Sequence, residues 1–170
     1  MNMTYLSLLF LGLFSFSASA LEVGETAPCV VLEHINADGS ETSQCIREAN
    51  EEGQLKVLEF FSAFCSACKR NLPLFSSLNK EFGEDVTFRL VGIDRNENAL
   101  RRYRTSNKSL INFQVALDTD RDAKRAYDII ATPTLFVLDE NDKVLYKHIG
   151  VLGQKDLDAL RAIFKASINK

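Results

Sequence analysis

Two cysteines separated by two residues are the strongest chemical signal in this sequence. Cys65 and Cys68 follow an apolar, strand-like run, Leu55–Phe61, and a helical pattern begins directly after them. This order places both thiols at the N-terminus of a helix, where free N–H groups and the positive end of the helix dipole stabilise a thiolate. A thiolate beside a second thiol is the reactive unit of dithiol–disulfide exchange.

The two thiols are expected to have different roles. Cys65, at the very start of the helix, is the candidate nucleophile, with a pKa expected below the free value of about 8.5. Cys68 lies one turn further in and should attack Cys65 to release the product. The alternative is a structural disulfide, but so short a loop removes little entropy from the unfolded chain. We therefore interpret the pair as redox-active.

The other two cysteines are expected to pair with each other. Four cysteines allow three pairings, and the close pair leaves Cys29 for Cys45. A disulfide closing about 15 residues stabilises the fold by roughly 3 kcal/mol in the loop-entropy model. We interpret Cys29–Cys45 as a structural disulfide. A second redox pair that passes electrons to Cys65 is the alternative.

The N-terminal residues are typical of an exported protein. The run from Leu6 to Phe16 is almost continuously apolar, and Ala18-Ser19-Ala20 is a small-x-small cleavage pattern. This predicts a signal peptide over residues 1–20 and a soluble mature domain over 21–170. An uncleaved N-terminal anchor is the alternative, although the run is shorter than the roughly 20 residues of a membrane span. Both interpretations put the folded part in the periplasm or another exported location, where disulfides persist.

The element pattern predicts one α/β domain. A chain of 170 residues is long enough for one core, and a net charge of −3 argues against nucleic-acid binding. Strands and helices alternate first, then a hairpin and a terminal helix follow, which predicts a mixed central β-sheet flanked by helices on both faces. Strands are expected at 29–34, 40–43, 55–61, 86–93, 113–117, 135–138 and 144–149. Helices are expected at 44–50, capped by Ser43, and at 65–82, 96–105, 154–167 and just before Tyr127.

The chain resembles the thioredoxin fold and, within it, the exported TlpA/ResA/CcmG-like thiol–disulfide oxidoreductases. The Gly-x-x-Ala-Pro opening at 24–28, the segment 60–68 with Pro73, Thr132-Pro133-Thr134 and the segment 138–150 carry the resemblance, which covers the mature chain. A Cys-x-x-Cys after an apolar strand, with a Thr-Pro some 65 residues on, is a specific combination. Phe64 stands where these proteins usually have Trp, and Asn71 stands where many have Glu.

The resemblance implies roles for three further residues. Glu59 matches the buried acid of thioredoxins, and a buried carboxyl could take the proton from Cys68; an exposed glutamate at a sheet edge is the alternative. Pro133 is expected to be cis and to pack beside the cysteine pair, rather than to be an ordinary strand-entry proline. The backbone of Thr132 would then offer hydrogen bonds to an extended substrate.

The function expected first is that of an exported thiol–disulfide oxidoreductase without a cofactor or bound metal. It would act as a monomer on disulfides of other exported proteins. The resemblance implies a membrane thiol electron donor and service to cytochrome c maturation. The direction of electron flow is left open.

Two other functions are alternatives on the same fold. A thioredoxin-fold copper metallochaperone would use Cys65 and Cys68 as ligands together with a placed histidine, but His34 and His148 lie in strand segments far from the pair in sequence. A thiol peroxidase would need a peroxidatic environment that the sequence does not reveal. A basic cluster, formed by Arg101, Arg102, Arg104 and Lys108, is interpreted as a solvated helix face.

Overall fold

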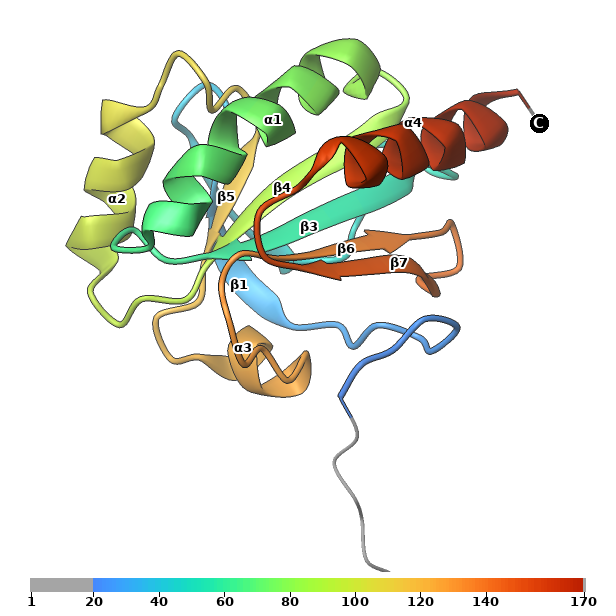
Figure 1. The fold of residues 1–170 in the computed structure, drawn as a ribbon. Helices are drawn as coiled ribbons and strands as arrows, with labels where there is room; N and C mark the ends of the chain where they lie inside the picture. Colours follow the sequence, from blue (N-terminus) through green and yellow to red (C-terminus); the bar gives the residue numbers. More distant parts are fainter. Residues whose placement is uncertain (1–19, 170) are drawn as a thin grey trace, which may run out of the picture.

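A single mixed sheet organises the chain, and the computed structural model describes it over residues 20–169 (Figure 1). Its seven strands lie in the order β2-β1-β5-β4-β3-β6-β7. The strands are β1 (Val31–Ile35), β2 (Glu41–Cys45), β3 (Leu55–Phe61), β4 (Val86–Gly92), β5 (Gln114–Leu117), β6 (Thr134–Leu138) and β7 (Val144–Ile149). The helices are α1 (Ser66–Phe82), α2 (Glu97–Ser106), α3 (Asp122–Ala126) and α4 (Gln154–Ile168).

The middle of the sheet is buried on both faces. Strand β3 runs parallel to β4 and antiparallel to β6, and every residue of these three strands is buried. Strands covered on both sides lack an alternation of buried and exposed residues, and even the polar residues here, such as Glu59 and Arg89, are buried. The carboxyl end of β3 is therefore held between neighbours on both sides. The active loop, residues 62–64, leads from this end to Cys65.

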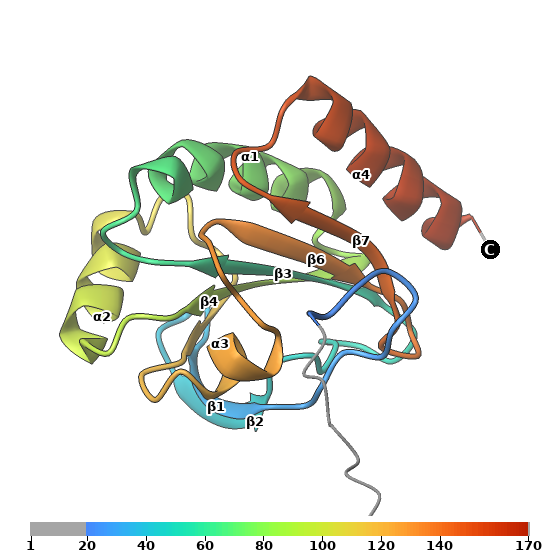
Figure 2. The ribbon, with the colours of Figure 1, turned by 60° about the horizontal axis from the view of Figure 1, so that its bottom comes forward.

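Helices cover both faces of the sheet, as the sequence predicted. Side chains of α1, α2 and α4 share one core with the sheet, and α3 packs into a second core on the opposite face. Figures 1 and 2 show α1 and α4 lying together above the sheet and α3 below it. The expected α/β, thioredoxin-like arrangement is confirmed.

Helix α1 forms where the helical periodicity predicted it. Leu72, Phe75, Leu78 and Phe82 recur at three- and four-residue spacing, and all four are buried against the sheet. Pro73 lies inside the helix, and Gly83 ends it by donating its N–H to the carbonyl of Asn79 at 2.7 Å. This packing fixes the direction in which the helix N-terminus points.

The expected helix over residues 44–50 is wrong. Gln44 and Cys45 instead complete β2, where Cys45 pairs with Val31 of β1, and turns follow up to β3. Ser43 is consequently a strand residue and not a helix cap. Pairing with β1 keeps residues 43–45 extended, although Ser43 is a residue type that can cap a helix.

Helix α2 approaches the sheet closely at the end of β4. A Cβ added at Gly92 would collide with Cδ2 of Leu100 in α2, so a larger residue there would require this leucine side chain to shift. The basic residues of α2 are not all solvated, which corrects the sequence interpretation. Arg101 forms ion pairs with Glu33, Glu41 and Glu97, and Arg104 donates to backbone carbonyls in the β1–β2 turn.

The end of β2 is fixed by a disulfide and by a buried cation. Cys29 and Cys45 are bonded, with their Cα atoms 5.5 Å apart. Arg89 of β4 is fully buried and donates to the backbone carbonyls of Cys45 and Ile46. Burial lowers the pKa of Arg89 to about 10, so this cation stays charged at neutral pH. A buried cation depends on such acceptors, because unpaired charge in a protein interior is costly.

We predict that the double variant Cys29→Ser, Cys45→Ser loses about 3 kcal/mol of unfolding free energy, because its unfolded chain gains the freedom of the opened loop. Urea denaturation of the two proteins measures the difference. Disulfide exchange at Cys65 and Cys68 should be unaffected. A matching loss of exchange would instead support the alternative that this pair relays electrons.

Candidate active site

The site is built at the junction between β3 and α1. Cys65 is the N-cap of α1, with φ −82° and ψ 114°, and its Sγ accepts a hydrogen bond from the backbone N–H of Cys68 at 3.1 Å. This is the place of a capping oxygen, so the sulfur satisfies one of the free N–H groups of the first turn. Negative charge on this sulfur is stabilised by the same N–H group and by the helix dipole.

The two sulfurs are joined to each other and differ in accessibility. Cys65 and Cys68 form a disulfide with a Cα–Cα distance of 5.3 Å. Cys65 is partly exposed, whereas Cys68 has only 1% of its surface exposed. An incoming group can therefore reach Cys65 first. This difference matches the order of attack expected from the sequence; the catalytic roles of both residues stay predictions.

The Thr132–Pro133 segment lies against the reactive sulfur. The peptide bond between these two residues is cis, as predicted. The carbonyl oxygen of Thr132 is 3.3 Å from Sγ of Cys65, and the carbonyl of Pro133 accepts the N–H of Gly150 at 2.8 Å. The structure thus brings Thr132 and Pro133 to the cysteine pair. Their role in binding substrate stays a prediction.

Asp94 fixes the loop that leads into Cys65, and the sequence analysis did not identify it. One carboxylate oxygen accepts from the Ser62 hydroxyl and the other from the Ala63 N–H, both at 2.7 Å. Asp94 follows β4, which is parallel to β3, so both strands deliver their next residues to the same edge of the sheet. A polar residue directly after a predicted buried strand was the available signal.

Glu59 is fully enclosed beneath the site. It lies in β3 with 1% of its surface exposed, and its Oε2 accepts from Nδ2 of Asn71 at 2.8 Å. Asn71 uses its other side-chain atom, Oδ1, to accept the N–H of Leu152 at 2.9 Å. Asn71 is three residues after Cys68 on the same helix face, so carboxyl and thiol share one side of α1. Glu59 is therefore not an edge residue; its part in proton transfer stays a prediction.

The carboxyl of Glu59 is protonated at neutral pH. Burial raises the pKa of Glu59 to about 8, and the hydrogen bond from Asn71 only partly opposes this. A buried carboxyl with such a pKa can both hold and release a proton near pH 7. Burial raises the pKa of Tyr103 to about 12, and the charge of Glu59 adds to this shift.

We predict that Glu59→Gln makes the oxidised protein more stable at alkaline pH. An unfolded glutamate ionises near pH 4.5 and the folded one near 8, so the folded chain binds more protons between these values. Stability must then fall as the pH rises from 4.5 to 8, at up to about 1.4 kcal/mol per pH unit. The glutamine variant lacks this loss and keeps the bond with Asn71.

Urea denaturation of both oxidised proteins from pH 4 to pH 9 measures this difference, because disulfide-bonded cysteines do not titrate. The two stability curves should separate above about pH 5 and run parallel again above about pH 8. Curves that stay parallel over the whole range would mean that Glu59 ionises normally.

We predict that Asp94→Ala loosens the active loop without unfolding the domain. The variant loses both hydrogen bonds to residues 62 and 63, at an expected cost of about 1–3 kcal/mol. Hydrogen exchange at the Ala63 amide should quicken locally. Unchanged protection at Ala63 would show that the loop does not depend on Asp94.

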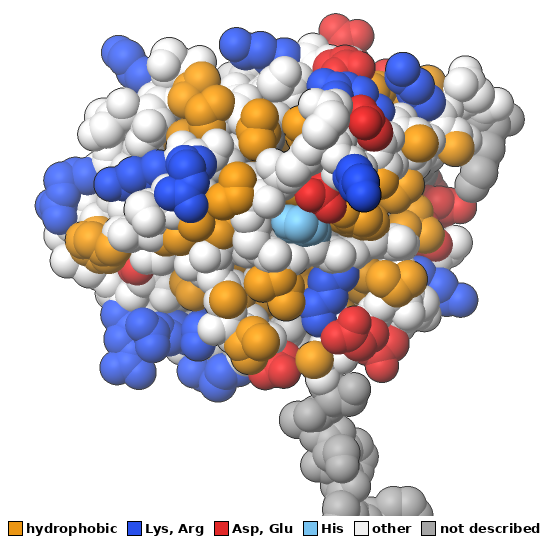
Figure 3. Space-filling view, viewed as in Figure 1, with side chains coloured by type: hydrophobic (Ala, Val, Ile, Leu, Met, Phe, Trp, Pro, Cys, Tyr) orange, Lys and Arg blue, Asp and Glu red, His pale blue; other side chains and the backbone are white. Residues whose placement is uncertain are grey.

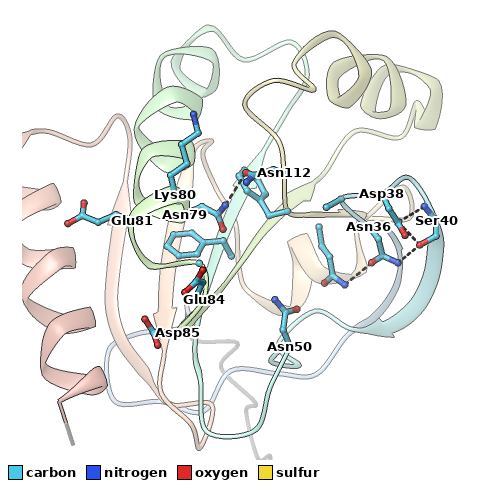
Figure 4. Close-up of a pocket in the computed structure, with 15 residues that line it drawn as sticks. Asn36, Asp38, Ser40, Asn50, Asn79, Lys80, Glu81, Glu84, Asp85 and Asn112 are labelled. Atoms are coloured by element: carbon cyan, nitrogen blue, oxygen red, sulfur yellow. Dashed lines mark hydrogen bonds between the residues drawn. The ribbon is translucent and has the colours of Figure 1, made fainter.

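One large hollow of the described structure is not part of this site. It has a volume of about 950 Å³ and lies at the C-terminal end of α1, about 25 Å along that helix from Cys65 (Figure 4). Its amides bond mainly to one another: Asn79 donates to Asn112 at 3.0 Å and Gln114 donates to Asn36 at 2.8 Å. The thiol chemistry does not involve this hollow.

Neither histidine joins the cysteine pair. His34 is buried in β1, where burial, followed by the charge of Arg89, lowers its pKa to about 4. Nδ1 of His148 lies 3.1 Å from the carboxylate of Asp156. Within residues 20–169, no three His, Cys, Asp or Glu side chains are grouped as metal ligands would be. No observation therefore favours the copper alternative.

A disulfide at the start of α1, beside a cis proline and above a buried acid, defines a thioredoxin-like protein. The chain belongs to the AhpC/TSA family, whose model matches residues 23–147. It is a thioredoxin-like thiol–disulfide oxidoreductase. The resemblance noted in the sequence is thereby confirmed.

Two curated relatives come from Bacillus subtilis. Sporulation thiol-disulfide oxidoreductase A is 27% identical over 156 residues, which are 88% of this chain and 90% of the relative. Thiol-disulfide oxidoreductase ResA is 29% identical over 126 residues, 74% of this chain and 66% of the relative. A solved structure from Chlorobium tepidum, described as a thiol:disulfide interchange protein DsbE, has a TM-score of 0.70 at 22% identity and shares the fold. It is matched over 87% of this chain and 99% of its own.

The expected signal peptide is not tested by the structure, because residues 1–19 lie outside the described part of the chain. Among residues 20–169, no helix is both long and apolar enough to span a bilayer.

Proposed function

We propose that this protein reduces or exchanges disulfides of other exported proteins, with Cys65 as the nucleophile and Cys68 as the resolving thiol. The observation that carries the proposal is the position of Cys65 as N-cap of α1, partly exposed, with Cys68 buried behind it. Signal-peptide cleavage after residue 20 and monomeric action belong to the same proposal.

The proposed reaction has two exchange steps. The Cys65 thiolate attacks one sulfur of the substrate disulfide, forms a mixed disulfide, and expels the other substrate sulfur as a thiolate. The ionised fraction of Glu59, which is the minority at neutral pH, accepts the proton of Cys68. The Cys68 thiolate then attacks Sγ of Cys65, which releases the second substrate thiolate. The substrate gains two electrons, and the protein is left with the 65–68 disulfide observed here. Asn71 holds the Glu59 carboxyl at the helix face that carries Cys68.

Substrate approach is supported by the surface around Cys65. Phe64 and Ile130 are 73% and 79% exposed, on the loops that precede Cys65 and Thr132. Exposed apolar side chains of this size beside a reactive group are typical of contact surfaces for other proteins. The backbone of Thr132, next to the sulfur, is the proposed hydrogen-bonding strip for an extended substrate segment.

The electron donor and the pathway follow from the family resemblance. A membrane thiol protein that re-reduces the 65–68 disulfide would make the protein a reductant, and maturation of apocytochrome c is the process that the CcmG-like branch of the resemblance implies. The reduction potential of the 65–68 pair tests the direction. A value near −270 mV supports a reductant, and one near −120 mV an oxidant.

We predict that Cys65→Ser abolishes reduction of a disulfide-bonded model peptide, whereas Cys68→Ser accumulates a mixed disulfide, because the resolving attack is missing. Mass spectrometry of acid-quenched reactions with dithiothreitol-reduced protein detects the adduct. Full activity of Cys65→Ser would refute the assignment. Hydrogen peroxide offered in place of the peptide distinguishes a thiol peroxidase.

A further inference from the structure

A groove borders the active loop on the side of α2. Ala63 and Phe64 line it from the loop before Cys65, Lys69 from α1, and Arg102 and Tyr103 from α2; its volume is about 380 Å³. Helix α2 follows β4, whereas Thr132 precedes β6, and these strands flank β3 on opposite sides. The groove is therefore separate from the Thr132 strip, with Cys65 between them.

Apolar side chains line part of the groove, beside the uncharged polar residues Ser106 and Asn107. Phe64 is 73% exposed at its edge, and its N–H is bonded to Oγ of Ser62 at 3.2 Å within the loop that Asp94 holds. Tyr103 is nearly buried and its ring lies 4.8 Å from that of Phe61. Burial raises the pKa of Tyr103 to about 12, so its hydroxyl carries no charge at neutral pH. An anchored aromatic edge over such a floor suits an apolar side chain.

The charge of the groove is entirely positive. Lys69 and Arg102 are exposed, and no aspartate or glutamate is among the residues that line it. Within the described residues neither cation forms an ion pair, in contrast to Arg101 of the same helix, which contacts three glutamates. Lys and Arg side chains also predominate on the side of Figure 3 where α2 and the start of α1 lie, although the net charge of the chain is −3.

Lys69 stands where a helix is least favourable to a cation. It lies in the first turns of α1, which has no acidic residue in its first turn, and a positive charge there opposes the helix dipole. The same charge stabilises a thiolate on Cys65. Lys69 therefore acts on the chemistry as well as on the groove. Arg102 belongs to another helix, which makes it the cleaner probe of binding.

We propose that this groove binds the substrate segment on one side of the reacting cysteine, and that the segment carries a carboxylate beside an apolar side chain. This inference rests on the proposed function and names the substrate class of the same site. The carboxylate pairs with Arg102 and Lys69 while the apolar side chain packs on Phe64. Opposite charge at the rim also raises the rate of encounter, an effect that salt screens.

The test uses two disulfide-bonded peptides that differ only in a flanking Glu or Lys. Rate constants for their reduction by the dithiothreitol-reduced full chain are measured at about 20 mM and about 0.5 M NaCl. Wild type should reduce the Glu peptide about fivefold faster at low salt, the size of one exposed ion pair. The preference should disappear at high salt. Arg102→Glu should reverse it.

The matched control is Lys80→Glu, which adds negative charge at the far end of α1 and should keep the wild-type preference. Reduction of the 65–68 disulfide by dithiothreitol at about 0.5 M NaCl, where salt screens the charge of the attacking thiolate, should be equal in wild type and Arg102→Glu, which separates binding from thiol chemistry. Equal rates for both peptides, or equal effects of Arg102→Glu and Lys80→Glu, would overturn the inference alone. If the reduced protein reduced neither peptide, the proposed function and this inference would both be overturned.

Discussion

The whole site depends on a sulfur atom taking the place of a helix cap. Strand β3 is buried on both faces and ends where the carboxyl ends of the parallel strands meet. Helix α1 begins there, with Cys65 as its N-cap. The N–H of Cys68 points at this sulfur, so backbone geometry stabilises negative charge there, and the positive charge of Lys69 adds to this. The packing of α1 on the sheet holds this geometry, which links the core directly to the chemistry.

Burial of a carboxyl below that helix is the second constraint. A charged Glu59 would be costly inside the core, so the group is neutral until about pH 8 and keeps one bond to Asn71. The resemblance noted in the sequence implies an acid at the helix position that Asn71 occupies here. The two positions touch in this chain, which explains how carboxyl and amide can exchange places while the acid stays on the same side of the helix.

The sequence predicted the elements that are organised by local pattern. The junction at Cys65 and the buried face of α1 follow from periodicity over a few residues, whereas the burial of Glu59 was expected from the resemblance. The missed features depend on partners far along the chain. Pairing with β1 and the bond to Cys29 decide the conformation of Cys45, and Arg101 finds two of its glutamates in β1 and β2. The position of Asp94 directly after a buried strand marks it as a candidate, but its neighbours in the sequence do not reveal that it holds residues 62 and 63.

Helix α2 lies in the connection between β4 and β5, and this position has a consequence for how such proteins diversify. The thiols and the acid belong to β3 and α1, whereas α2 touches the sheet edge at Gly92 without contributing to that chemistry. Exchanging the outward residues of α2 would leave the electron-transfer unit intact. Partner choice could therefore drift in evolution, or be redesigned, as an independent module.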